Sequence, residues 1–288
     1  MSLFKILVTG SGGQLGSEIR SLSESYPLID FTFADREQFP LHTPDVFEAY
    51  FANKNFTHCI NCAAYTAVDK AEDEPHIAFL LNSTAVKRLA MACSANRVTL
   101  IHISTDYVFN GNANSPYTEI DETDPVNLYG SSKLEGEQLA LQHNEKTLII
   151  RTSWLYSIYG KNFVKTMIRL MNEKESIGVV ADQVGSPTYA RDLAAAILTI
   201  ITQHGNLTTG IYHYCNQGVI SWFQFATAIK EITKSSCDVK AIRTEDYPTP
   251  AKRPSYSAFN TTKIQAEFDI AIPDWEVSLR ECIAAMER

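Results

Sequence analysis

The sequence predicts an α/β protein built on a Rossmann-type, doubly wound parallel sheet, with a smaller α/β lobe towards the C-terminus. Three observations favour this class. Apolar runs of strand length alternate with helical patterns through the first half of the chain, which is typical of parallel sheets covered by helices. A glycine-rich turn joins the first apolar run to the first helical pattern. The 288 residues, with 45% hydrophobic content, suffice for one large domain and a smaller lobe.

The elements of the first domain follow from these runs. Residues 3–9 are a short apolar run that ends at a glycine turn, so they predict a buried strand. Thr43, Pro44 and Asp45 predict a helix start, because they supply a capping hydroxyl, a proline at the first helical position and an acid in the first turn. The further expected strands are 30–34, 59–64, 98–104 and 147–152, and the further expected helices are 14–25, 75–96 and 128–143.

The later part of the chain is less regular. Its sequence shows no repeat and no low-complexity linker, so the second lobe should pack on the first. We expect the first domain to cover residues 1–155 and the lobe mainly residues 156–288, with later segments partly returning to the sheet. Helices are expected at 162–172, 191–202, 222–233 and 275–286, strands at 177–180 and 211–214, and a proline-rich loop at 245–254.

Composition disfavours several classes of partner. The net charge is -8 and like charges form no block, whereas proteins that bind phosphate backbones are usually basic, so we expect no nucleic-acid partner. Every apolar stretch is well below the length of a membrane span, so we expect no membrane partner. The run 3–8 is interrupted by Lys5 and is too short for a signal peptide, which favours the cytoplasm.

The cysteines and histidines indicate neither a disulfide framework nor a metal site. The six cysteines lack a framework spacing, as expected in a reducing compartment. Cys59 and Cys62 form a C-x-x-C within an expected strand, where residues three apart face opposite sides of the sheet, so buried thiols are the better interpretation. The seven histidines show no metal-ligand spacing, and we expect no metal.

A glycine pattern lies between the first expected strand and the first expected helix. Gly10 can make the tight turn, Gly13 lets the backbone approach a pyrophosphate, and Gly16 lets helix and strand pack closely. The helix N-terminus then presents free N–H groups to the phosphates. This pattern predicts dinucleotide binding, with a glycine turn that binds nothing as the alternative. The residues expected to bind the dinucleotide here are Gly10, Gly12, Gly13, Gln14, Leu15 and Gly16.

Two neighbours at the end of the second expected strand leave the kind of dinucleotide open. Asp35 lies where an acid would hydrogen-bond the adenosine ribose 2′-hydroxyl, which favours NADH. Arg36 could instead pair with the 2′-phosphate of NADPH. The sequence therefore predicts NADPH or NADH as the cofactor, while a solvated turn would also explain both residues.

Tyr129 and Lys133 are the most informative pair in the chain. Residues four apart share one helix face, and a nearby ammonium favours the phenolate, so we expect Lys133 to lower the pKa of Tyr129 and make it a usable general acid. Thr105 follows an expected strand at the edge where ligands of such sheets bind, and its hydroxyl can orient a carbonyl. Together with the glycine turn, these three residues predict hydride transfer at a carbonyl.

In the order 9–16, 104–109 and 129–133, these residues resemble the extended short-chain dehydrogenase/reductase family. Within it, the chain is similar to the dTDP-4-dehydrorhamnose reductases. The stretches around Asp69 and Asp182 are the most specific, because the superfamily motifs alone are widely shared. The narrower resemblance covers most of the chain, through residues 63–72, 151–154, 162–163, 182–188 and 253–254.

The resemblance implies a reaction and a role for each catalytic residue. NAD(P)H would reduce the 4-keto group of dTDP-6-deoxy-L-lyxo-4-hexulose to give dTDP-L-rhamnose. Tyr129 would protonate the oxyanion, Lys133 would hold the nicotinamide ribose, and Thr105 would orient the carbonyl.

The resemblance also implies residues around the two ligands. Arg253 would meet the diphosphate, since a guanidinium fork matches phosphate oxygens. Each of these residues also has a purely structural interpretation: Trp154 as a core residue, Asp69 as a helix cap and Arg253 as a solvated loop cation. The implied cofactor contacts are Ala63, Ala64 and Tyr65, and the implied substrate contacts are Val68, Asp69, Thr105, Tyr107, Trp154 and Arg253.

Two other functions stay open. A 4,6-dehydratase or 4-epimerase for nucleotide sugars could use the same scaffold, but related dehydratases usually follow the threonine with Asp-Glu, where this chain has Asp106 and Tyr107. A non-catalytic regulatory subunit, like that of methionine adenosyltransferase, would not need Thr105, Tyr129 and Lys133 together.

Assembly is also open. Some members of the family dimerise around Mg²⁺, held by acidic side chains near the segment 187–188 and the C-terminus. Here that segment continues as Tyr189, Ala190 and Arg191, and the arginine disfavours a metal-linked dimer. The sequence leaves a homodimer without metal open.

Overall fold

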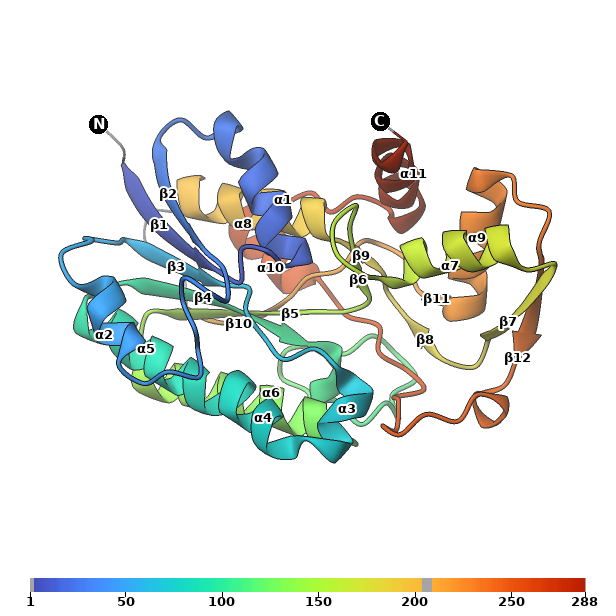
Figure 1. Cartoon of the computed structure of the whole chain (residues 1–288), viewed down its shortest axis with the longest axis horizontal. Coiled ribbons are helices and arrows are strands. Elements are labelled where there is room, and N and C mark those ends of the chain that lie inside the picture. The colour runs from blue at the N-terminus through green and yellow to red at the C-terminus, as the bar shows by residue number, and fades with distance from the viewer. Residues whose placement is uncertain (1–2, 204–208, 288) are drawn as a thin grey trace.

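The computed structural model describes residues 3–203 and 209–287. Its centre is a six-stranded sheet in which all strands run parallel, in the order β10-β5-β4-β3-β1-β2 (Figure 1). The order reverses between β1 and β3, and ligands of open parallel sheets bind at such a point, beyond the carboxyl ends of the strands. The strands are β1 (Phe4–Thr9), β2 (Ile29–Ala34), β3 (His58–Asn61), β4 (Thr99–Thr105), β5 (Thr147–Thr152) and β10 (Gly210–His213).

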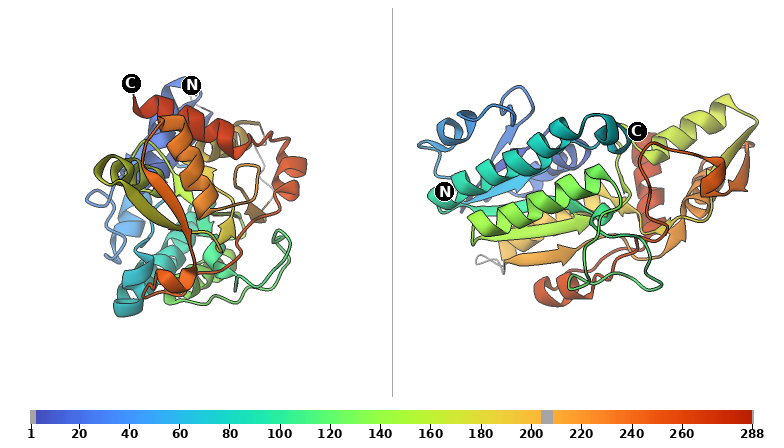
Figure 2. Two further views of the ribbon diagram at one scale, coloured as in Figure 1. Left: turned by 90° about the vertical axis from the view of Figure 1, so that its right-hand side faces the viewer. Right: turned by 90° about the horizontal axis from the view of Figure 1, so that it is seen from below.

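Helices cover both faces of this sheet (Figures 1 and 2), which confirms the predicted doubly wound fold. In β1, Ile6 and Val8 point into one core, whereas Leu7 points into the other, so both sides of the strand are apolar. The first core is covered by α1 (Gln14–Leu22), α8 (Ala190–Gln203) and α10 (Thr262–Phe268). The second is covered by α2 (Val46–Phe51), α5 (Ala85–Ala95) and α6 (Leu128–His143).

The smaller lobe has its own core, at the right of Figure 1. Three helices pack there around β7 and β12, which pair in parallel. Two-residue strands lie between the lobes, where β6 pairs with β9 in parallel and β8 with β11 antiparallel. These elements are α7 (Phe163–Glu173), α9 (Trp222–Thr233), α11 (Trp275–Met286), β6 (Leu155–Tyr156), β7 (Ser176–Val180), β8 (Val184–Gly185), β9 (Thr188–Tyr189), β11 (Ile220–Ser221) and β12 (Asp238–Ile242).

Later segments contribute to the large domain. Strand β10 lies at one edge of the main sheet beside β5, and α8 and α10 pack in its first core. A domain boundary at residue 155 remains a prediction.

Several predicted elements differ from the structure. The helix expected to start at Thr43 begins at Val46 with Asp45 as its N-cap, and Thr43 belongs to a preceding turn in which its N–H donates to Pro40 O at 2.9 Å. The strand expected at 59–64 ends at Asn61, whose side chain accepts from Ala63 N at 3.3 Å. The helix expected at 75–96 consists of α4 (Pro75–Phe79), a π turn at Leu80–Thr84 and α5. The helix expected at 14–25 ends at Leu22 and continues as a 3₁₀ turn, Ser23–Ser25. The elements that were not predicted are α3 (Val68–Asp73), α10, β12, the two-residue strands and the 3₁₀ turns Asp106–Val108 and Thr244–Asp246.

Candidate active site

The glycine turn lies between the carboxyl end of β1 and α1. Gly10 has φ +64°, and a Cβ there would lie 2.6 Å from Ala63 N, so the position requires glycine. A Cβ at Gly16 would lie 2.6 Å from Gly10 O, so the turn and the helix pack directly on each other. Gly13 is the N-cap of α1 without a capping side chain, and a Cβ at Gly12 would meet no described atom within 4 Å. Uncapped first-turn N–H groups that face open space fit a pyrophosphate.

The residues after the glycines have different surroundings. The Gln14 side chain is engaged at both ends, donating from Nε2 to Leu155 O at 3.3 Å and accepting at Oε1 from Asn162 Nδ2 at 3.0 Å. Leu15 is buried in the first core. Gln14 and Leu15 therefore offer their backbone to a ligand more readily than their side chains.

Asp35 and Arg36 differ in how available their charged groups are to a ligand. Asp35 Oδ1 accepts from the backbone N–H groups of Glu37 at 2.9 Å and Gln38 at 3.0 Å, so this carboxylate closes its own turn. Arg36 is exposed. The guanidinium is thus the freer of the two groups at the end of β2.

Thr105, Tyr129 and Lys133 come together where β4 ends and α6 begins. All three side chains are buried. The Tyr129 and Thr105 side chains lie within hydrogen-bonding reach of each other. Lys133 Nζ donates to Ile103 O at 2.7 Å, which fixes the ammonium against the backbone near the carboxyl end of β4. The structure thus assembles the predicted acid, its hydroxyl partner and the cation at one edge of the sheet.

Burial raises the pKa of Tyr129 above its ordinary value, and the neighbouring Thr105 hydroxyl offsets this only in part. The charge of Asp106 and the nearby Tyr107 raise the pKa further. The expectation that Lys133 lowers this pKa is therefore wrong for this structure, where the ammonium is committed to a backbone carbonyl. A phenol with a raised pKa keeps its proton at neutral pH, which is the form that a general acid needs.

Burial also lowers the pKa of Lys133, to about 8, although the charge of Glu137 opposes this. Glu137 in turn forms a buried ion pair with Arg151 at 2.7 Å. Lys133 is therefore a cation near neutral pH that loses its proton within the mildly alkaline range.

Asp106 is a buried carboxyl next to Thr105. Thr105 Oγ1 donates to Asp106 Oδ1 at 3.0 Å and accepts from Tyr107 N at 3.3 Å. Burial raises the pKa of Asp106 to about 6, while hydrogen bonds from Ser257 and Thr105 oppose the shift. Thr105 must leave this carboxylate in order to donate to a substrate carbonyl.

Three predicted substrate residues meet in one polar cluster, Asp69, Tyr107 and Arg253. Arg253 Nη2 pairs with Asp69 Oδ2 at 2.8 Å, and Arg253 Nη1 donates to Tyr107 Oη at 2.9 Å. The Tyr107 ring lies edge-on to the Tyr129 ring, with centroids 5.5 Å apart. The guanidinium is therefore one aromatic ring away from the reaction centre, and 24% of its side chain is exposed, so an anion can reach it.

Trp154 and Val68 complete the predicted substrate set. Trp154 has φ +47°, which is unusual outside glycine and is typical of functional sites. Its ring stacks on Trp222 with centroids 3.5 Å apart, and a Cβ at Gly185 would lie 2.7 Å from it. Val68 packs against the small apolar cluster that contains Tyr129. Trp154 is thus held rigidly between the lobes, while Val68 belongs to the apolar surroundings of the reaction centre.

The comparisons with known proteins agree with this geometry. The family model described as RmlD substrate binding domain matches residues 4–288. The dTDP-4-dehydrorhamnose reductase of Aggregatibacter actinomycetemcomitans is 39% identical over 292 residues, covering 98% of this chain and 99% of that protein. The chain belongs to the RmlD family.

Solved structures of the RmlD family superpose closely on this chain. The dTDP-4-dehydrorhamnose reductase of Clostridium acetobutylicum is 38% identical, with a TM-score of 0.94 over 99% of this chain and all of that chain. The enzyme of Bacillus anthracis, solved in complex with NADP, is 37% identical, with a TM-score of 0.94 over 99% of this chain and 100% of that chain.

Among the RmlD-family segments, the structure gives Asp182 a supporting role. Its carboxylate accepts from Thr244 N at 3.0 Å and from Thr244 Oγ1 at 2.7 Å. Thr244 begins the loop that carries Arg253, so Asp182 fastens that loop to the lobe.

Sequence reasoning missed Asn82, a fully buried side chain in the π turn. Its Oδ1 accepts from Tyr65 N at 2.8 Å, and its Nδ2 donates to Tyr65 O and to Ser132 Oγ, both at 3.0 Å. Asn82 thereby joins the predicted cofactor segment Ala63–Ala64–Tyr65 to the catalytic helix. The one signal in the sequence is an asparagine inside an apolar helical pattern.

Within residues 3–203 and 209–287, the structure has neither a membrane-spanning helix nor a cluster of metal ligands. None of the described helices is both long and apolar enough to cross a bilayer. In the same residues, no three His, Cys, Asp or Glu side chains gather as metal ligands would.

Proposed function

We propose that this protein reduces the C4 ketone of dTDP-4-dehydrorhamnose to dTDP-L-rhamnose with NADPH or NADH, and that Tyr129 is the proton donor. The observation that carries this proposal is the buried set of Thr105, Tyr129 and Lys133 beside a glycine turn that fits a dinucleotide. Full-length relatives named for this activity support the substrate.

The residues divide the work of the reaction. The dinucleotide, when bound, supplies the hydride to C4. The backbone of the glycine turn holds the pyrophosphate, and Lys133 offers a cation to the ribose. Tyr129 then gives its proton to the C4 oxygen. Because the pKa of Tyr129 is raised, the proton stays on the phenol until charge develops on that oxygen, which is far more basic than a phenolate.

The substrate side relies on an exchange of partners. The Arg253 guanidinium donates to Asp69 and Tyr107. A diphosphate would replace these two partners and accept two parallel hydrogen bonds from the same guanidinium. Trp154 presents a rigid ring from the junction of the lobes, and Val68 limits the space beside Tyr129. This arrangement suits a sugar nucleotide whose sugar lies at Tyr129 and whose phosphates lie at Arg253.

Within the cofactor pair, we propose a preference for NADPH. Asp35 is engaged by its own turn, whereas Arg36 is exposed where a 2′-phosphate would lie. The relative from Bacillus anthracis was solved with NADP. Comparing the KM values of NADPH and NADH, in wild type and in Arg36→Ala, tests this preference.

The test of the main proposal is the absorbance of the reduced nicotinamide with the 4-keto sugar nucleotide as substrate. We expect one NADPH to be consumed for each ketone, with dTDP-L-rhamnose as the product. Conversion of a sugar nucleotide without net NADPH loss would favour an epimerase or a dehydratase instead. Ligand binding or capture of a partner protein without turnover would favour a regulatory subunit.

We also propose that the protein works in the cytoplasm and that any homodimer forms without a metal. The support for the second point is Arg191, which lies 3.5 Å from Glu18 and supplies a positive charge to a buried carboxylate. The molar mass from light scattering, with and without a chelator, tests it. Loss of a dimer on chelation would contradict the proposal.

A further inference from the structure

One face of α1 carries three polar side chains, Gln14, Glu18 and Ser21. Their spacing places them on a single stripe of the helix. Each of these three side chains forms a hydrogen bond with a residue outside the glycine turn. The helix that begins the dinucleotide site is therefore also tied to the rest of the chain along this stripe.

Gln14, the first residue of this stripe, binds the segment that leaves the sheet for the smaller lobe. It contacts Leu155 O in β6 and the Asn162 side chain at the start of α7. Gly160 has φ +65°, and a Cβ there would lie 3.1 Å from Gln14 Cγ. The segment 155–162 is thus shaped around this side chain.

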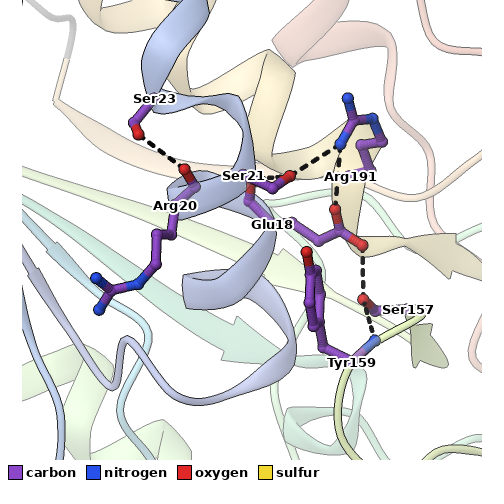
Figure 3. Close-up of polar contacts among 7 residues, drawn as sticks. All are labelled: Glu18, Arg20, Ser21, Ser23, Ser157, Tyr159 and Arg191. Atoms are coloured by element: carbon purple, nitrogen blue, oxygen red, sulfur yellow. Dashed lines mark hydrogen bonds and ion pairs between the residues drawn. The ribbon is translucent and has the colours of Figure 1, made fainter.

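Glu18 is the centre of the stripe, and its side chain is completely buried (Figure 3). Ser157 Oγ donates to Glu18 Oε1 at 2.6 Å, and Ser157 Oγ itself accepts from Tyr159 N at 3.0 Å. Arg191 Nη1 lies 3.5 Å from the other oxygen, Oε2. One carboxylate therefore reaches both the outgoing segment and the start of α8.

Ser21 ends the stripe by accepting from Arg191 Nη1 at 2.9 Å. Arg191 is the second residue of α8, which directly follows β9, the strand through which the chain returns from the smaller lobe. Strands β6 and β9 pair in parallel, Leu155 with Thr188 and Tyr156 with Tyr189. The outgoing and the returning strands are therefore bonded to each other, and the segments that follow them, Ser157 and Arg191, are bonded to one face of α1.

A buried carboxylate at this position is costly for folding. Burial raises the pKa of Glu18, and the bond from Ser157 and the charge of Arg191 oppose this only in part. The Arg191 side chain is 45% exposed, so solvent weakens its attraction. Apolar residues of similar volume often replace buried charges without loss of stability. The Glu18 carboxylate is thus better explained by the segments that it orients than by a contribution to the free energy of folding.

We propose that Glu18 is a positioning residue for the reaction: through Ser157, directly after β6, and Arg191, at the start of α8, it holds the paired strands β6 and β9 near the helix α1 and so sets where the substrate lobe meets the cofactor. The residue that acts on the substrate through this junction is Trp154, which directly precedes β6 and has a strained backbone. This inference rests on the proposed function.

Steady-state kinetics of Glu18→Leu, Glu18→Gln and Ser157→Ala test the proposal. We expect Glu18→Leu to raise the KM of the sugar nucleotide about tenfold, because small misplacements of binding groups cost large factors. The KM of NADPH should stay close to wild type, since the glycine turn is unchanged. Glu18→Gln keeps an oxygen acceptor for Ser157 and should recover most of the loss, while Ser157→Ala should show an intermediate rise.

Arg20→Ala is the matched control, because Arg20 lies on the same helix but points away from Glu18 (Figure 3). Its Nη2 donates to Ser11 Oγ at 3.1 Å and its guanidinium lies over Phe33. Its sugar-nucleotide KM should match wild type. Unchanged substrate KM in Glu18→Leu, or a parallel change in both KM values and in thermal stability, would overturn the proposal. If Glu18→Leu does not fold, Ser157→Ala decides by the same criterion.

A second measurement separates this inference from the proposed function. Hydrogen exchange in peptides covering residues 154–162 should be faster in Glu18→Leu than in wild type, with α6 unchanged. This readout needs no turnover, so it holds even if wild type fails to reduce the 4-keto sugar. Equal exchange at 154–162 would contradict the positioning role.

Discussion

The reaction centre and the substrate cluster are neighbours built in different ways. Thr105, Tyr129 and Lys133 come from one strand end and one helix of the large domain, and all three are buried. Asp69 and Arg253 are 184 residues apart and both stay partly exposed. The two regions meet at the aromatic contact between Tyr107 and Tyr129, and the cap of α6 is also tied to the loop of Arg253, since Asn127 Nδ2 donates to Lys252 O at 2.8 Å.

This difference indicates how each region meets its ligand. The chemical groups are held by backbone geometry, as when Lys133 donates to Ile103 O, and need no ligand to stay in place. Arg253 is held by its ion pair with Asp69, which the diphosphate of the proposed substrate would have to replace. Changes in the first region should therefore lower kcat, and changes in the second should raise the KM of the sugar nucleotide.

The largest expected effect is that of Tyr129→Phe. Loss of the proton donor should lower kcat about 10³-fold, within the range typical of a general acid. The fold should persist, because one hydrogen bond contributes about 1 kcal/mol. Single-turnover rates and thermal unfolding would measure both effects. Tyr107→Phe, which removes the neighbouring hydroxyl, is the control and should keep most of kcat. Equal losses of kcat in the two variants would contradict the assignment of Tyr129 as the proton donor.

Lys133→Met should lower kcat about 10²-fold, since the proposed ribose contact loses its cation. The free energy of unfolding should stay the same or increase, because burying a charged amine is costly. Urea denaturation at pH 7 alongside kinetics would check this pair of outcomes. If the variant were inactive only because it unfolds, a direct role of Lys133 in the reaction would be contradicted.

The pH dependence of wild type should report the same residue. The pKa of Lys133 is lowered to about 8, so activity should fall as pH rises through 8, and Lys133→Met should lack this alkaline limb. For stability the sign is opposite: between pH 8 and the ordinary value of 10.5 the unfolded chain binds the proton more tightly, so this group's contribution to stability rises with pH. Rate profiles and unfolding midpoints across pH 7–10 would test both.

On the recognition side, Arg253→Ala should raise the KM of the sugar nucleotide about 10–100-fold, because hydrogen bonds to charged groups contribute about 1.5–3 kcal/mol. The effect on kcat should be smaller. Lys252→Ala is the matched control, since Lys252 is the exposed neighbouring cation in the same loop. A kcat loss as large as that of Tyr129→Phe would place Arg253 in the reaction centre instead.

Asp182→Ala should have the smallest effect. It removes the bonds to Thr244 that fasten the loop of Arg253, worth about 1 kcal/mol or about fivefold in the KM of the sugar nucleotide. Asp238→Ala, an exposed acid in the neighbouring strand β12, should leave that KM unchanged. If Asp182→Ala changed the KM of NADPH instead, its role at the substrate loop would be wrong.

Locally encoded features were predictable. Helix α6 has the predicted bounds, and Asn127 caps it by accepting from Gly130 N at 2.8 Å. The strands of the main sheet were found because residues buried on both faces read as continuous apolar runs. The glycine turn was predictable because the close approach at Gly10 excludes a side chain. These signals depend on a few neighbouring residues.

Features that depend on distant partners were not predictable. Strands β6 and β9 have two residues each and exist only because they pair with each other. The pKa of Tyr129 was expected to fall but is raised, because burial outweighs the effect of the neighbouring Thr105 hydroxyl and Lys133 is engaged elsewhere. The π turn that points Asn82 at Tyr65 has no periodic signature.

By itself, the sequence determined the strands of the main sheet, the glycine turn and α6, and it supplied the hypothesis for the reaction centre, since these follow from hydrophobic periodicity and short spacings. Only the tertiary structure decided how Asp69 meets Arg253, how α1 holds the junction of the lobes through Glu18, and which protonation states burial favours. The physical reason is that ion pairing and desolvation depend on groups brought together by the fold, and their separation along the chain carries no trace of that contact.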